Sequence, residues 1–293
     1  MLGLLPLTML GTGTREIEAF PSYLVRLASS HGITTGRLLR LMLTDGKDSS
    51  IGLAAAIQSQ PFAGLVRPNA TTLGVLQCTS RHVIESLETL THGTFVHLLP
   101  ALKRSANTYV CTVRWCPACL GEQENDQGSA YLKLSWFLQE VETCAIHRIR
   151  LRDQCPSCQR IARPLNRWTT FTACQHCETR LDRVSADDVV KINPQATAPD
   201  LIKLIADLAH RVAPFPTRGV NRYVDQVFSE AWASQREQEL WKRLPRDDCL
   251  RYASAEEPVT LAAARRIAYL LEVPISELLE GDLPSIQSFG FPD

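Results

Sequence analysis

The sequence lacks the short motifs that mark common nucleotide-binding and nucleophilic enzymes. It contains no GxxxxGKS/T phosphate loop, no GxGxxG turn and no GxSxG nucleophile elbow. Internal repeats and low-complexity tracts are also absent. The chain therefore gives no motif-based reason to expect an enzyme of those kinds.

Long apolar runs and an excess of charge of one sign are missing as well. No stretch approaches 18 consecutive apolar residues, and the apolar start from Met1 to Leu10 has no basic residues before it. Membrane spanning and secretion are therefore not expected. We expect a cytoplasmic protein. Lys and Arg number 31, as do Asp and Glu, which argues against a strong non-specific DNA binder.

Metal-capable side chains, in contrast, are concentrated between residues 116 and 177. Four pairs with a gap of two residues lie there: Cys116 and Cys119, Cys144 and His147, Cys155 and Cys158, and Cys174 and Cys177. A CxxC turn presents two sulfur atoms to one ion, and two such pairs complete a tetrahedron around zinc. The pattern predicts two structural zinc ions.

The pairs are expected to combine in sequence order. The first site then has 24 residues between its halves and the second has 15, the latter within the usual range for zinc. An alternative joins the two inner pairs and leaves the two outer pairs to combine. Cys111 and His176 are local competitors as ligands, whereas Cys78 and Cys249 are expected to be buried small hydrophobic residues. Disulfides are not expected, because no secretory signal supports oxidation.

Catalysis is not expected at either site. Four protein ligands leave no open position for water or substrate. A nucleobase deaminase would need H-x-E followed downstream by P-C-x-x-C. His176-Cys177-Glu178 matches the first part, but no CxxC follows it. The order of the motifs argues against a deaminase, and the chain is interpreted as a binding module.

The zinc region is the basic part of the chain. Residues 101–183 contain 12 Lys and Arg against 8 Asp and Glu, whereas residues 184–293 contain 12 against 17. Arginine suits bidentate contact with phosphate. Six arginines lie around the ligands and are candidate contacts for nucleic acid or a partner: Arg148, Arg150, Arg152, Arg160, Arg163 and Arg167. The alternative is that a small zinc module simply carries solvated charge.

The residues before the zinc region are expected to be helical. One helix is predicted to start at Pro21 and to stop at Gly32, and another to follow a cap at Thr34 or Thr35. This arrangement resembles a helix-turn-helix, although a plain helical hairpin fits it too. Further helical signals lie at 51–58 and 80–90.

Helices are also expected within and after the zinc region. One helical face is predicted from Tyr131, Leu134, Phe137 and Leu138, with Trp115 and Trp136 packed on the zinc sites. Residues 193–199 are interpreted as a linker before helices at about 200–211 and 220–243. Thr260 is expected to cap a further helix, and Pro274 and Gly281 to bound a short one. The last two helices resemble the end of a Cro/repressor-type helix-turn-helix fold.

The predicted fold class is mainly α with small zinc-ribbon-like modules. It comprises an N-terminal helix-turn-helix-like domain at 1–100, a tandem zinc-binding domain at 101–183 and a C-terminal helical, helix-turn-helix-like domain at 184–293. The length of 293 residues allows this number of small domains.

The order of motifs resembles the TniQ/TnsD family of transposon target-site selection proteins. That family has W-C-P-x-C, an aromatic-rich segment, C-x-x-H and then CPxC, and this chain has WCPACL, YLKLSWFLQEVETCAIH and LRDQCPSC. The stretch EAFPSYLVRLASSHGI resembles the opening of the family at six positions: Glu18, Ser22, Leu24, Arg26, Leu27 and Ala28. The resemblance covers roughly residues 15–180.

The resemblance implies a non-enzymatic adaptor in the bacterial cytoplasm. Family members choose where a transposon inserts and recruit an AAA+ ATPase regulator, which delivers the transposase. Some bind target DNA directly, and others dock on a CRISPR effector ribonucleoprotein. The N-terminal region would face the ATPase, with Ser22, Tyr23 and Arg26 as candidate contacts, and the zinc and helix-turn-helix parts would face DNA or the effector. The acidic C-terminal third favours docking on protein, and a homodimer is compatible with the sequence.

Two other functions remain open on the residues alone. A zinc-containing helix-turn-helix transcription regulator would bind promoter DNA without a transposition partner. A metalloenzyme would need an open zinc position, and substitution of His147 by cysteine would then abolish activity.

Overall fold

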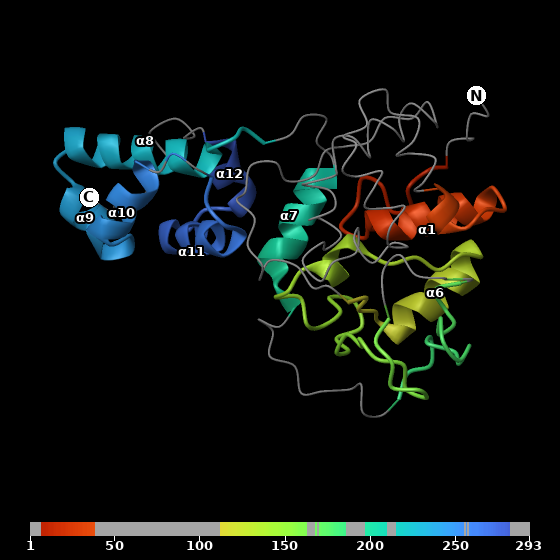
Figure 1. Ribbon diagram of the computed structural model, residues 1–293. Coiled ribbons are helices and arrows are strands. Elements are labelled where there is room, and N and C mark those ends of the chain that lie inside the picture. The colour runs from red at the N-terminus through yellow and green to blue at the C-terminus, as the bar shows by residue number, and fades with distance from the viewer. Residues whose placement is uncertain are drawn as a thin grey trace, which may run out of the picture. The chain divides into compact units, whose positions relative to one another are not determined.

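The computed structural model describes residues 7–38, 112–162, 168, 170–185, 197–209, 215–254, 256 and 258–281 (Figure 1). The chain divides into two compact units. The described part of the first unit ends at residue 209, and the described part of the second begins at residue 215. The described residues are mostly helical, and they form isolated β-bridges but no sheet. The expectation of a mainly helical fold with small metal-binding modules is confirmed.

The first unit contains several described helices as well as its metal-binding loops. The helices are α1 (Phe20–Ser30), α6 (Pro117–Gln127), the 3₁₀ helix η1 (Leu134–Phe137) and α7 (Pro199–Ala209). The predicted helices at 51–58 and 80–90 lie outside the described residues. The N-terminal segment and the metal region thus belong to one compact unit.

Helix α1 begins and ends as its sequence predicts. Proline occupies its first turn, where a missing N–H costs nothing. Gly32 follows its end with a φ of 63°, in the left-handed region that favours glycine. A second helical turn starts as predicted after Thr34, whose hydroxyl accepts the Arg37 N–H at 3.2 Å. The remainder of the predicted helix-turn-helix lies outside the described residues.

The prediction of a helix from Tyr131 to Leu138 is wrong, except that the short 3₁₀ helix η1 forms within this stretch. The chain before η1 is extended and pairs with the N-terminal segment, because Ala19 N donates to Leu132 O at 2.7 Å and Leu134 N donates to Ile17 O at 2.9 Å. These bonds occupy main-chain groups that a longer helix would use internally. The apolar side chains that suggested the helix are nevertheless all buried.

A buried arginine satisfies the carbonyl groups at the end of η1. The guanidinium of Arg114 donates to Trp136 O at 3.0 Å, to Gln139 O at 3.4 Å and to Leu138 O. Burial lowers the pKa of Arg114 to about 10. Arg114 therefore serves as the cap that a helix end requires, a role that sequence reasoning missed.

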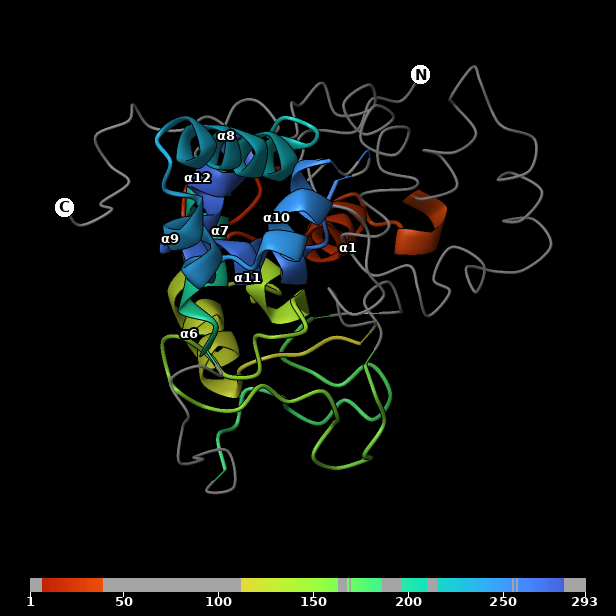
Figure 2. The same ribbon diagram turned by 90° about the vertical axis from the view of Figure 1, so that its left-hand side faces the viewer.

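The second unit is a cluster of helices. They are α8 (Gly219–Ala233), α9 (Glu237–Arg243), α10 (Arg246–Ala253), α11 (Leu261–Leu271) and α12 (Ile275–Glu280). Helix α8 lies against α10 and α12, and α11 packs on α12 (Figures 1 and 2). Two glycines permit the close approach of α8 to the end of α12: a Cβ on Gly219 would lie 1.9 Å from Leu279 O, and Gly281 has a φ of 74°.

Most of the predicted C-terminal features are present. The Thr260 hydroxyl accepts the Ala263 N–H at 3.2 Å at the start of α11, and Gly281 follows the end of α12. Cys249 is buried as expected. The helix predicted at 220–243 is instead two helices, α8 and α9, because Gln235 adopts a φ of 57° between them. Helix α10 was not predicted.

Among the described residues, none of the helices combines the length and the apolarity that a membrane crossing requires.

Candidate metal centres

Three of the four ligand pairs lie in turns with the same backbone pattern. In each turn, the first residue of the pair accepts the N–H of the residue four positions later: Arg148 N to Cys144 O at 2.9 Å, Gln159 N to Cys155 O at 3.0 Å, and Glu178 N to Cys174 O at 2.9 Å. An isolated antiparallel bridge flanks each turn. The three N–H donors all have a positive φ, of 54°, 57° and 61°. We call these turns knuckles 144, 155 and 174, after their first cysteine.

The remaining pair is built differently, because a helix starts inside it. Cys116 is the N-cap of α6 and Cys119 lies in its first turn. Proline follows the N-cap, and Gly128 ends the helix in the left-handed conformation with a φ of 65°. Proline at the start and glycine after the end are common boundaries of a helix, so this helix was predictable although only a turn was expected.

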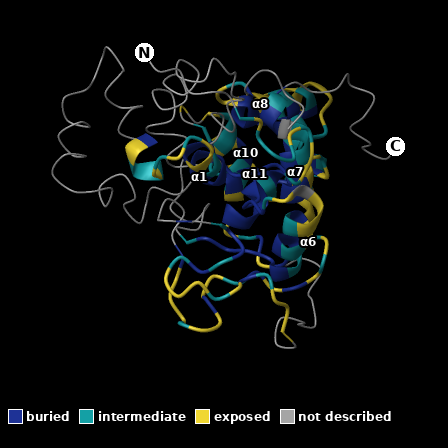
Figure 3. Ribbon diagram, turned by 90° about the vertical axis from the view of Figure 1, so that its right-hand side faces the viewer, coloured by how far each residue is buried: buried dark blue, intermediate teal, exposed yellow. Residues whose placement is uncertain are grey.

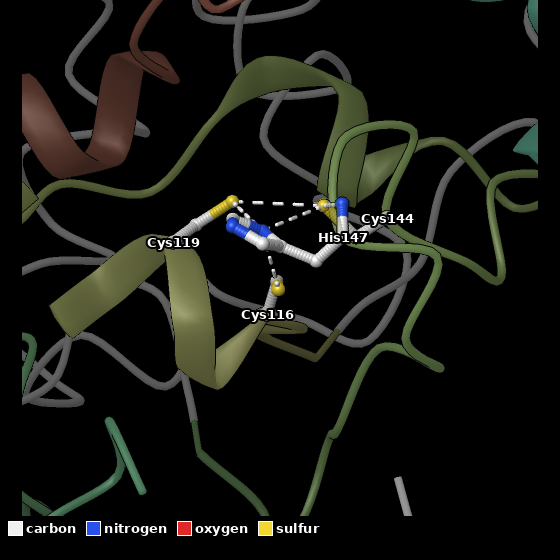
Figure 4. A group of neighbouring side chains, drawn as sticks. All are labelled: Cys116, Cys119, Cys144 and His147. Carbon is white, nitrogen blue, oxygen red and sulfur yellow. Dashed lines mark hydrogen bonds between the residues drawn. The ribbon is translucent and has the colours of Figure 1, made fainter. Parts of the chain in front are cut away.

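The first site joins the start of α6 to knuckle 144. Figure 4 shows Cys116, Cys119, Cys144 and His147 pointing toward one another. Cys119 Sγ lies 3.6 Å from Cys144 Sγ, and His147 Nδ1 lies 3.2 Å from Cys119 Sγ and 3.5 Å from Cys116 Sγ. The three cysteines are buried and the histidine is half-buried.

The second site joins knuckles 155 and 174. Cys155 Sγ lies 3.6 Å from Cys177 Sγ, and Cys158 Sγ lies 3.8 Å from Cys174 Sγ. This site is closer to solvent than the first, because Cys177 is exposed and Cys158 is half-buried. The structure thus groups the eight residues in sequence order and leaves His176 out of both groups. Cys111 lies outside the described residues.

Both groups fit one tetrahedral ion each. The ligand atoms of each group lie within 4.8 Å of one another. Zinc–sulfur bonds of about 2.3 Å at tetrahedral angles place two sulfur atoms about 3.8 Å apart, close to the separations of 3.6 and 3.8 Å found here. Four protein ligands fill such a coordination sphere, so neither group offers an open position for a substrate.

Neighbouring groups shift the pKa of several of these thiols. Hydrogen bonds from the neighbouring thiols lower the pKa of Cys144 far below its usual value, and hydrogen bonds within the same group raise the pKa of Cys119. In the second site, burial raises the pKa of Cys155 to about 12, whereas a hydrogen bond with Thr179 lowers the pKa of Cys177 to about 6. A bound cation would remove these differences in protonation among the thiols, because coordination deprotonates thiols outright.

Two charged residues contact the first site from outside. Glu122 Oε1 on α6 lies 2.7 Å from His147 Nε2, the ring nitrogen that faces away from the sulfur atoms. A carboxylate in this position orients a metal-binding histidine. On the other side, Lys133 Nζ donates to Cys119 Sγ at 3.1 Å and forms an ion pair with Glu16. Sequence reasoning missed both residues.

Both modules share a short stretch of chain in front of the first cysteine. Trp115 and Arg152 exchange two main-chain hydrogen bonds of 2.9 Å, and Val113 N donates to Ala162 O at 3.0 Å. The Trp115 indole donates to Leu181 O at 3.3 Å, beyond the second site. Trp115 and Trp136 are almost fully buried, as expected for core residues of this region.

The structure places four of the six candidate arginines on loops near the ligands. Arg148, Arg150 and Arg160 are exposed in knuckles 144 and 155, and Figure 3 shows exposed residues along these loops. None of the three guanidinium groups has a partner among the described residues. Arg152 is half-buried and donates to Ser185 Oγ at 2.9 Å. The other two, Arg163 and Arg167, lie outside the described residues.

The candidate ATPase contacts are turned inward. Ser22 and Tyr23 are fully buried, and the side chain of Arg26 is only 13% exposed. Ser22 Oγ donates to Glu18 Oε1 at 2.7 Å and Arg26 Nε donates to the same oxygen at 2.9 Å. Glu18 Oε2 also accepts the Leu10 N–H at 3.2 Å. These side chains hold α1 in place, so their burial speaks against a partner-facing role.

A comparison with models of known protein families finds a match, which covers the N-terminal segment and the first metal site. The family model of TniQ matches residues 10–151, about half of the chain. The match contains the Glu18 network, α1 and all four residues of the first site, and it ends before Cys155. No curated protein matches the sequence.

Proposed function

We propose, from the membership of this chain in the TniQ family through residues 10–151, that it is an adaptor in the targeting of DNA transposition. A role associated with transposition follows from the family. The finer proposal is that the protein links target DNA, or an RNA-guided CRISPR effector complex, to an AAA+ ATPase regulator. Its location would be the bacterial cytoplasm.

The observation that carries this proposal is the closed geometry of both metal centres. Each group could supply four side chains to one ion, which would saturate a tetrahedral zinc. Zinc in such sites stabilises a fold, and in finger peptides it contributes on the order of 10 kcal/mol. We infer that both ions are zinc, that they are structural, and that neither metal centre is catalytic.

The exposed arginines of knuckles 144 and 155 are proposed to contact nucleic acid or the effector. Arg148 and Arg150 flank the exposed first knuckle, in which Ile146 is 44% exposed. Unpaired guanidinium groups bind phosphate bidentately, and a neighbouring apolar side chain adds contact area. The ATPase would instead meet an exposed part of the N-terminal region, since Ser22 and Tyr23 are buried.

Metal analysis and a binding assay test the proposal together. We expect about two zinc ions per chain by elemental mass spectrometry of the purified protein. Co-purification should recover an AAA+ regulator and either target DNA or an effector ribonucleoprotein. A tight complex with promoter DNA and no transposition partner would favour the transcription regulator instead. The mass of the free protein in solution would report whether it is a homodimer.

A matched pair of arginine variants tests the proposed contact surface. Arg150 and Arg180 occupy the same position in knuckles 144 and 174, where each forms the flanking bridge. Arg180 is paired with Asp182, whereas Arg150 has no partner among the described residues. Arg150→Ala should weaken binding and reduce its salt dependence, and Arg180→Ala should have little effect. Equal effects of the two changes would remove this surface from the proposal.

A further inference from the structure

The buried lysine beside the first metal centre has no explanation in the four-ligand scheme. Lys133 is only 5% exposed, yet it carries a charge between the metal site and the N-terminal segment. We propose that Lys133 balances the charge of the first centre and couples metal binding there to the placement of the N-terminal segment. The inference rests on the proposed metal in that centre and goes beyond it, because it assigns a role to residues outside the ligand set.

Charge counting gives the reason for a cation at this place. Three thiolates and a neutral imidazole around a divalent ion leave the first centre with one net negative charge. Lys133 Nζ lies 3.1 Å from Cys119 Sγ, within hydrogen-bonding distance of one of those thiolates. Buried charge is costly unless it is paired, so the lysine and the metal-bound thiolate stabilise each other.

The second centre has no equivalent. Four thiolates around a divalent ion carry two negative charges, but no lysine or arginine donates to its sulfur atoms among the described residues. Greater exposure compensates, since Cys177 is in contact with solvent. The lysine is therefore a feature of the first centre and not a general requirement of such sites.

The same lysine also contacts the N-terminal segment. Its ammonium group forms an ion pair with Glu16, and it lies 5.5 Å from the centre of the Trp136 ring. The hydroxyl of Tyr131 donates to Glu16 O at 3.0 Å. Main-chain pairing of residues 17–19 with 132–134 continues this contact. Lys133 thus lies at the junction of the first centre and the segment that precedes α1.

Loss of the metal would change this junction. Without a divalent ion, coordination no longer fixes the Cys119 sulfur beside Lys133, so the contact between the two side chains weakens. The lysine then has Glu16 as its one charged partner among the described residues. A buried ammonium with fewer partners is less stable, so the pairing of residues 16–19 with 132–134 should loosen. Metal binding at the first centre thereby stabilises the N-terminal segment through Lys133.

Metal competition tests the first half of this inference. Full-length protein loaded with Zn²⁺ or Co²⁺ is titrated with a chelator, and the cobalt spectrum distinguishes the site with three cysteines and one histidine from the site with four cysteines. Lys133→Met should weaken the first site by about 10- to 100-fold, the usual effect of a residue that supports metal ligands. The second site provides the internal control and should be unchanged. Lys133→Arg, which retains the charge, should restore most of the affinity.

Hydrogen exchange tests the second half. In Lys133→Met with both sites saturated by zinc, amides of residues 16–30 should exchange faster than in the unsubstituted protein. Glu16→Gln should accelerate the same amides while leaving chelator competition within a few-fold of the original. Cys177→Ser, which perturbs the second site, serves as the matched control and should leave these amides unchanged.

The outcomes separate this inference from the proposed function. Two bound zinc ions with no loss of first-site affinity in Lys133→Met would overturn the inference and leave the metal centres standing. Faster exchange throughout the first unit, instead of at residues 16–30, would show a loss of folding and also overturn it. Protein that binds no metal would overturn both.

Discussion

Removal of the buried carboxylate of Glu18 should destabilise the first unit severely. Glu18 is 1% exposed and accepts hydrogen bonds from Leu10 N, Ser22 Oγ and Arg26 Nε. Glu18→Ala leaves three donors without this acceptor, one of them the charged guanidinium of Arg26. Removing one partner of a buried ion pair costs about 3–5 kcal/mol. The ion pair is largely shielded from solvent, so screening reduces this value little.

The assay is denaturation of zinc-saturated protein, followed by tryptophan fluorescence. Trp115 and Trp136 are buried in the same unit and report its unfolding. Glu16→Gln is the matched control, because Glu16 lies two residues away but its side chain is 27% exposed. We expect a change of about 1 kcal/mol or less for the control, as for other partly exposed ion pairs.

One result would refute the assignment of these residues to internal structure. If Glu18→Ala and Arg26→Ala abolish ATPase binding while the free energy of unfolding changes by less than about 1 kcal/mol, the network serves a partner after all. A double-mutant cycle on Glu18 and Arg26 measures their coupling, which should be at least about 1 kcal/mol for a charge-assisted hydrogen bond at this depth.

Further predictions concern the backbone, the second site and the second unit. Gln159→Gly should raise stability by about 1 kcal/mol in denaturation, because it relieves a positive φ of 57°. Gly219→Ala should unfold the second unit in circular dichroism, since its Cβ would lie 1.9 Å from Leu279 O. Thr260→Ala should cost about 1 kcal/mol through loss of the cap on α11. Alkylation followed by mass spectrometry should modify the exposed Cys177 first, and protection of the first site should outlast it.

Local patterns in the sequence predicted local structure well. Thr260 precedes an apolar pattern of helical spacing, and α11 starts there with the expected cap. The gaps of 24 and 15 residues between pairs led to the grouping that the structure contains. Spacing and capping depend on neighbours in the chain, so a single sequence carries them.

Features that depend on distant partners were not predictable in this way. Tyr131 to Leu138 has a helical apolar pattern, but pairing with residues 17–19 keeps its first part extended. Nothing in the residues around Lys133 in the sequence distinguishes it from other lysines. Only the fold brings Glu16 and Cys119 into contact with it. Ser22 and Tyr23 were candidate contacts for the ATPase because the resemblance assigns the N-terminal region to that partner, yet the structure buries both.

Residues 113–115 determine how a force would pass between the two metal modules. The exit of the first module pairs with Trp115, and the exit of the knuckle at 155 pairs with Val113 two residues away. A partner that pulls on one module must therefore strain the hydrogen bonds that also anchor the other. The two metal modules are therefore expected to move together as one rigid body. A force applied to either module would be transmitted to residues 113–115.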